Sequence, residues 1–153
     1  MVEIRRDSTL HVDEEGHFFH DGQRVEHPGL ARALSSWIQR RPDGRWVLDN
    51  GYDWCWLSVA DTPLVVRAVH VRAGALMVRL SDESEEGVDA RALTVDERGG
   101  VRCTVKAGRP CGPYPARFDR YAQLQFGELL REVEGRVWVD LGGRLVPLGL
   151  DPE

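Results

Sequence analysis

Turn signals that contain glycine recur along this chain, and they favour a fold built from short antiparallel hairpins. Asp-Gly and Asn-Gly pairs are the strongest of these signals, because a type I′ turn needs positive φ at both central residues. Hairpin turns are predicted at Asp21-Gly22, Asn50-Gly51, Ala73-Gly74, Arg98-Gly99-Gly100 and Gly142-Gly143.

Two segments with helical periodicity interrupt the hairpins. In "PGLARALSSWIQRR", apolar residues recur at helical spacing from Leu30 to Ile38, with Pro28 at the entry. A longer helix is predicted roughly from Ala116 to Val133, where Phe118, Ala122, Phe126, Leu129 and Val133 share one face. The expected fold is therefore α+β, with two small subdomains at 1–60 and 61–153, each combining hairpins with one main helix.

A short internal repeat supports two related halves. The first helix is followed by "GRWVLD" (44–49), a turn and a strand, and the second is followed by "GRVWVD" (135–140), a turn and a strand. Two helix–hairpin units separated by about ninety residues predict an ancient duplication.

Composition limits the classes of binding partner and the cellular compartment that we expect. The net charge is −5 and the charges of the two signs are interleaved, which argues against nucleic acid as the main partner but leaves room for a local basic pocket for one phosphate. The N-terminus "MVEIRRDSTL" lacks the apolar stretch of a signal peptide, and no apolar run approaches the ~20 residues of a membrane helix. Three cysteines without a C-x-x-C pair fit a reducing compartment. We expect a cytoplasmic protein with no membrane partner.

The segment "WVLDNGYDWCW" (46–56) concentrates aromatic residues around one predicted turn. A two-residue turn at Asn50-Gly51 would place Val47 opposite Trp54 and Arg45 opposite Trp56, so that one face carries Arg45, Val47, Asp49, Tyr52, Trp54 and Trp56. Core packing is the commoner role for such a hairpin. The alternative is a face that lines a cleft, where Arg45 binds an anion and a ring stacks on a base.

Histidines and acids suggest metals but lack the required spacing. His11, His17, His20 and His27 lie close in sequence, but the hairpin register separates them, which predicts solvated histidines rather than a zinc site. The segment starting at Asp82 begins like a calcium loop, yet Leu93 stands where a bidentate Glu is needed. A solvated acidic turn between two hairpins is predicted instead.

The cysteines divide into a core residue and a reactive candidate. Cys103 alternates with Val101 and Val105 on an apolar strand face, which predicts burial. Cys111 lies in a Gly/Pro loop before the predicted long helix, with Arg109 and Arg117 nearby, and both features favour a reactive thiolate. No dinucleotide, P-loop, zinc-protease or nucleophile-elbow motif is present, so no cofactor and no catalytic residue is predicted.

Three segments resemble a bacterial domain-of-unknown-function family of duplicated two-domain proteins: "GHFFHDGQRVEHP", then "LARALSSWIQRRPDGRWVL" followed by Asp61 and Pro63, and "GRVWVDLGGRLVPLG". The resemblance implies α+β halves, a second half similar to pleckstrin-homology-like folds, and a cleft between the halves that takes a nucleotide-like ligand in signalling. Where that family tends to have a Pro-Val-Glu-Lys-like segment, this chain has "NGYDW" (50–54).

Together these observations predict a non-catalytic ligand-binding or regulatory protein. Its small anionic ligand would lie between the halves, against Arg45, Tyr52, Trp54, Trp56, Arg67 and Arg79. The alternative is a protein–protein interaction module or homodimer that pairs through an exposed sheet edge such as 64–71. An enzyme whose site is assembled from distant loops is a third alternative.

Overall fold

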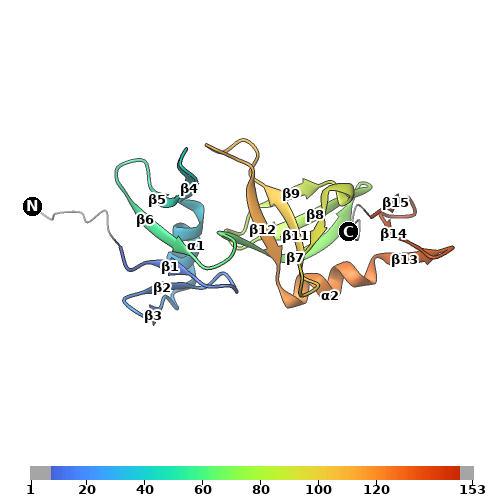
Figure 1. Ribbon diagram of the computed structural model, residues 1–153, viewed down its shortest axis with the longest axis horizontal. Helices are drawn as coiled ribbons and strands as arrows, with labels where there is room; N and C mark the ends of the chain where they lie inside the picture. The colour runs from blue at the N-terminus through green and yellow to red at the C-terminus, as the bar shows by residue number, and fades with distance from the viewer. Residues whose placement is uncertain (1–7, 149–153) are drawn as a thin grey trace, which may run out of the picture.

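The computed structural model describes residues 8–148, and its two sheet-rich halves lie one after the other along the long axis (Figure 1). In the first half, α1 (Pro28–Ser36) packs with a six-stranded sheet whose order is β3-β2-β1-β6-β5-β4. Its strands are β1 (His11–Val12), β2 (Phe18–His20), β3 (Gln23–Arg24), β4 (Ile38–Arg40), β5 (Trp46–Asp49) and β6 (Trp54–Val59).

The second half contains a six-stranded sheet of order β10-β11-β12-β7-β8-β9, followed by a three-stranded sheet of order β13-β14-β15. Its helices are η1 (Ala90–Ala92) and α2 (Arg120–Glu128). Its strands are β7 (Leu64–Arg72), β8 (Ala75–Leu80), β9 (Glu85–Val88), β10 (Thr94–Val95), β11 (Val101–Val105), β12 (Tyr114–Phe118), β13 (Leu130–Val133), β14 (Arg136–Asp140) and β15 (Leu145–Pro147).

The α+β prediction is confirmed, but two details of the second half are not. β7 pairs in parallel with β12 and antiparallel with β8, so the strand expected to offer an exposed edge at 64–71 lies inside the sheet. That prediction is wrong because it took the β7–β8 hairpin without its parallel neighbour. The pleckstrin-homology-like topology is not confirmed.

Both helices are shorter than predicted. α1 ends at Ser36 and Ile38 already belongs to β4, while α2 begins only at Arg120. The Asp119 side chain accepts a hydrogen bond from the backbone N–H of Ala122 at 2.8 Å and so caps the start of α2. Within residues 8–148, no helix is long and apolar enough to cross a membrane.

The predicted turns form, with one change of register. The chain between β5 and β6 is a four-residue loop (50–53), in which the Asn50 side chain accepts the N–H groups of Tyr52 and Asp53, both at 2.9 Å. Asp49 therefore pairs with Trp54, whereas the two-residue turn had paired it with Tyr52. Because the register moves by two residues, the side chains of the paired strands keep their predicted faces.

The predicted duplication is visible as the same path taken twice. Each main helix ends, and a strand pairs back onto the next strand, first as α1–β4–β5–β6 and then as α2–β13–β14–β15. The Asp49 N–H donates to the carbonyl of Trp37, the residue that caps α1, at 2.9 Å. In the same way the Asp140 N–H donates to the carbonyl of Leu129, the cap of α2, at 2.8 Å.

One hydrophobic core runs through both halves. At their junction Tyr114 of β12 is 1% exposed, and the Trp46 ring packs edge-on against it at 5.0 Å. The Tyr114 hydroxyl donates to the carbonyl of Pro110 at 2.7 Å and accepts the backbone N–H of Arg40 at 3.2 Å. The division into domains at residue 60 stays a prediction.

Candidate functional site

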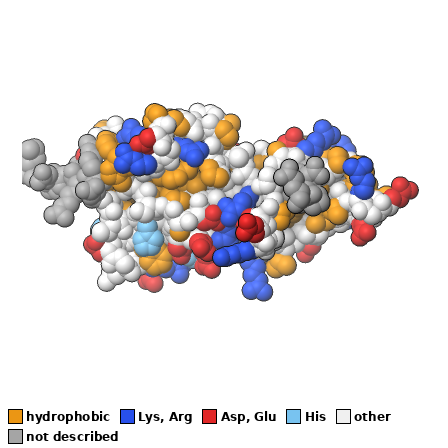
Figure 2. All heavy atoms as spheres, in the orientation of Figure 1, with side chains coloured by type: hydrophobic (Ala, Val, Ile, Leu, Met, Phe, Trp, Pro, Cys, Tyr) orange, Lys and Arg blue, Asp and Glu red, His pale blue; other side chains and the backbone are white. Residues whose placement is uncertain are grey.

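The aromatic strip on β5 and β6 is core on one face and an accessible Trp–Arg surface on the other. Trp54 and Trp56 are half-buried and meet edge-on at 5.0 Å. The Arg41 guanidinium lies over the Trp54 ring at 4.5 Å, and the Arg45 guanidinium lies over the Trp56 ring at 3.8 Å. Figure 2 shows hydrophobic side chains beside basic ones over this half. Tyr52 is 96% exposed in the loop.

The six residues predicted to form one ligand site do not converge. Only Arg45, Trp54 and Trp56 lie together. Arg67 of β7 forms an ion pair with Asp119 at 3.4 Å, and Arg79 of β8 pairs across the sheet with Glu85 of β9.

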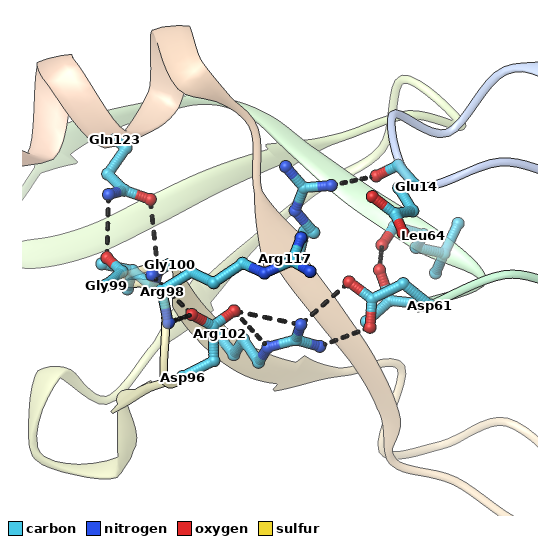
Figure 3. Close-up of polar contacts among 12 residues, drawn as sticks. Glu14, Asp61, Leu64, Asp96, Arg98, Gly99, Gly100, Arg102, Arg117 and Gln123 are labelled. Atoms are coloured by element: carbon cyan, nitrogen blue, oxygen red, sulfur yellow. Dashed lines mark hydrogen bonds and ion pairs between the residues drawn. The ribbon is translucent and has the colours of Figure 1, made fainter.

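A cleft of about 780 Å³ lies instead between the halves. Four arginines line it: Arg98, Arg102, Arg117 and Arg120. They come from the β10–β11 turn, β11, β12 and the start of α2, and they face Glu14 of the β1–β2 turn and the linker residues 60–61. Charged side chains of both signs gather over the middle of the molecule in Figure 2, and Figure 3 shows the contacts among them. We call this site the arginine cleft.

Strand alternation places two of these arginines side by side. On β11 and β12 every second side chain enters the core, so the intervening Arg102 and Arg117 face outward. The register makes them direct cross-strand neighbours. Like charges in that position destabilise a sheet unless other groups offset them.

Two aspartates balance the positive charge of Arg102. Its guanidinium donates to both carboxylate oxygens of Asp61, at 2.8 and 2.9 Å, and its Nε donates to Asp96 at 3.1 Å. The hydrogen bond to Asp61 is the main cause that raises the pKa of Arg102. The pKa of Asp96 is lowered, first by the backbone N–H of Gly100. Arg102 therefore joins the linker to β11 and contributes little unbalanced positive charge to the arginine cleft.

The charges of the other three guanidinium groups are not balanced by an ion pair with a described residue. Arg117 donates to the backbone carbonyl of Glu14, and Arg98 extends across the cleft (Figure 3). Within residues 8–148, no carboxylate lies within ion-pair distance of Arg98, Arg117 or Arg120, although Glu14 and Glu97 also line the cleft. The arginine cleft thus offers several charged N–H donors that have no ionic partner in the described part of the chain.

The two cysteine predictions fare differently. Cys103 is buried, as predicted, and burial followed by the charge of Glu86 raises the pKa of its thiol to about 12. Cys111 is exposed, but β12 and not a helix follows it. The helix N-terminus that was expected to activate Cys111 is therefore not next to it, and its redox sensitivity stays a prediction that rests on the arginines alone.

The acidic turn after β8 is not simply solvated, which corrects the prediction for this segment. The Asp82 side chain is only 4% exposed and forms an ion pair with Lys106 at 2.8 Å. Glu85–Val88 forms β9 rather than a loop. The sequence could not show this ion pair, because the partner lysine lies more than twenty residues away, directly after β11.

The four clustered histidines have separate environments. His11 stacks on Phe19 with ring centroids 4.9 Å apart, and His27 Nδ1 accepts the Leu30 N–H at 3.2 Å as the cap of α1. His17 and His20 each lie near carboxylates of their own turns.

Comparison with known proteins yields structural likeness alone. No protein-family model and no curated protein matches the chain. Two solved DUF1285 family proteins match. The one from Silicibacter pomeroyi DSS-3 is 20% identical with a TM-score of 0.69, over 93% of this chain and 80% of that one. The one from Shewanella baltica OS155 is 15% identical with a TM-score of 0.62, over 79% of this chain and 91% of that one.

These matches show a likeness of fold: this chain, with its two similar sheet-rich halves, shares its fold with two bacterial proteins of the DUF1285 family. The resemblance noted in the sequence is thereby confirmed at the level of the fold. The names of the two neighbours assign no activity.

Proposed function

We propose that this chain is a non-catalytic binding protein that takes a small anion, with phosphate or carboxylate groups, in the arginine cleft. The observation that carries the proposal is the set of three guanidinium groups, on Arg98, Arg117 and Arg120, that face one cleft without ionic partners among the described residues. Guanidinium forks match the paired oxygens of carboxylate and phosphate, and hydrogen bonds between charged groups are stronger than neutral ones.

The rest of the lining supports binding over catalysis. Among the described residues, no histidine, lysine, cysteine, serine or threonine lines the cleft. Carboxylates do line it, but two of the four, Asp61 and Asp96, are bound to Arg102. The cleft volume falls within the range of small-molecule sites. Of the described residues that line the cleft, Phe118 is the one aromatic and is buried, so the cleft favours the anionic part of a ligand over a stacked base.

The test is calorimetric titration of the full chain with inorganic pyrophosphate and with AMP. We expect the paired change Arg98→Ala and Arg120→Ala to raise Kd roughly 100-fold, because each arginine contributes a charged hydrogen bond. Arg24→Ala, which removes an exposed arginine on β3, should leave Kd unchanged. If neither probe binds the wild type, or if the two variants bind alike, the proposal fails.

A second variant tests the same site in the opposite direction. Asp61→Asn removes one of the two carboxylate charges that hold Arg102 and makes its guanidinium more available to the ligand. We expect pyrophosphate Kd to fall by roughly tenfold, which is the reverse of what general loosening of the fold would give. Circular dichroism of each variant checks that the fold is retained.

A further inference from the structure

The turn between β1 and β2 brings three metal-ligating atoms together. Asp13, Glu15 and His17 each offer one, and all three atoms lie within 4.8 Å of one another. His17 Nδ1 is 3.8 Å from Asp13 Oδ2 and 3.7 Å from Glu15 Oε2. These separations are too long for hydrogen bonds. They are close to the roughly 3.3–3.6 Å that separates two ligands of a tetrahedral ion with bonds of 2.0–2.2 Å.

The backbone of the turn holds these side chains in place. Asp13 Oδ1 accepts the N–H groups of Glu15 at 3.0 Å and His17 at 2.8 Å, while its Oδ2 is turned toward the His17 ring. Gly16, at φ 82°, lies so close to Val65 and Arg67 that a Cβ there would approach them to 2.8 and 2.9 Å. The turn is thus fixed against β7, and little has to move for an ion to enter.

We propose that this turn binds one divalent transition metal ion, with Zn²⁺ as the reference ion, through Asp13 Oδ2, Glu15 Oε2 and His17 Nδ1. Imidazole favours zinc, nickel and copper over magnesium and calcium, and two carboxylates neutralise the charge of a divalent ion. Two guanidinium groups lie against the turn: Arg67, which Asp119 offsets at 3.4 Å, and Arg117, which donates to the backbone carbonyl of Glu14 on the side of the arginine cleft. All three ligand side chains have solvent access, which gives the ion a path of entry and water for its remaining positions. The site is independent of the anion-binding function.

The experiment is calorimetric titration of the EDTA-treated, dialysed full chain with zinc chloride near neutral pH. It uses a Cys111→Ser background, because that thiol is exposed and thiolates are zinc ligands in general. We expect one equivalent of zinc. His17→Ala should raise Kd at least tenfold, and Glu15→Gln severalfold. His20→Ala is the matched control, since His20 lies on the same hairpin, 3.7 Å from a single carboxylate, and its loss should change nothing.

A second readout separates the proposed site from loss of structure. In ¹H–¹⁵N spectra of the imidazole nitrogens, zinc should shift the His17 signals and leave those of His11, His20 and His27 in place. Absence of a one-equivalent isotherm, an unchanged Kd in His17→Ala, or zinc-induced shifts at another histidine would each overturn the proposal.

Discussion

Lys106→Met is expected to lower the free energy of unfolding by about 3–5 kcal/mol, because it leaves the Asp82 carboxylate buried without its counter-ion. The Asp82 side chain is 4% exposed and the Lys106 side chain 13%, with 2.8 Å between Asp82 Oδ2 and Lys106 Nζ. Lys106 Nζ also donates to the Ser84 hydroxyl at 2.7 Å. Methionine keeps an unbranched side chain of nearly the same length, so the change removes mainly the ammonium group, with its charge and its hydrogen bond to Ser84. Urea unfolding followed by circular dichroism measures the difference.

The double variant Asp82→Asn with Lys106→Met is the control for this prediction. It removes both charges, and replacing a whole buried ion pair with neutral groups is often close to neutral. The double variant should therefore recover most of the stability lost by Lys106→Met alone. If it is as unstable as the single variant, lost packing and not an orphaned charge is the cause.

The pH dependence of the stability provides an independent test of the same prediction. Burial alone raises the pKa of Asp82, but hydrogen bonds from Lys106 and Ser84 outweigh burial and hold the pKa below its ordinary value. The ion pair of the wild type therefore contributes in full above the unfolded pKa of about 4, and this contribution is lost as pH falls through the lower folded pKa. In Lys106→Met only the hydrogen bonds from Ser84 still oppose burial, so the pKa of Asp82 rises above its wild-type value and acidification relieves part of the penalty. The stability gap between the two proteins should thus narrow from pH 7 toward pH 5.

The local fold follows from the sequence where the signal is local. Asp21-Gly22 and Ala73-Gly74 form the expected turns, and the repeat around 44–49 and 135–140 marks two equivalent helix–strand units. Even the misplaced turn at Asn50-Gly51 keeps Trp54 and Trp56 on the predicted face, because a two-residue shift preserves strand alternation. What these signals cannot provide is the parallel pairing of β7 with β12, because β8, β9, η1, β10 and β11 lie between these two strands in the sequence.

The arginine cleft was missed for a specific reason. Phe118, Ala122 and Phe126 keep helical spacing across the junction between β12 and α2, so the strand was absorbed into the predicted helix. Asp119 marks the true start of the helix, as a capping residue before it. Placing the helix start there would have exposed the alternation of β12 and put Arg117 on the outward face. Its pairing with Arg102 and the approach of Asp61 would still have required the tertiary structure.

Tyr114→Ala is expected to lower the free energy of unfolding by about 3–5 kcal/mol, because it removes one of the largest fully buried side chains and leaves a cavity at the junction of the halves. The ring supports Trp46, and the hydroxyl joins Pro110 to Arg40. Tyr114→Phe keeps the ring and loses only these two hydrogen bonds, so its cost should be nearer 1–2 kcal/mol, by the usual magnitude of such bonds, at about 1 kcal/mol each. The measurement is urea unfolding followed both by tryptophan fluorescence and by circular dichroism.

The more informative result is whether tryptophan fluorescence and circular dichroism report the same unfolding transition. One continuous core predicts a single transition for the wild type, since neither half can unfold without exposing apolar surface of the other. Phe126→Ala is the matched control, because Phe126 is equally buried but packs on Phe118 within the second half. Both alanine variants should lose comparable stability, but only Tyr114→Ala removes a contact between the halves and should separate the two transitions. Separation in Phe126→Ala as well would mean that the halves are coupled through the whole core rather than through Tyr114.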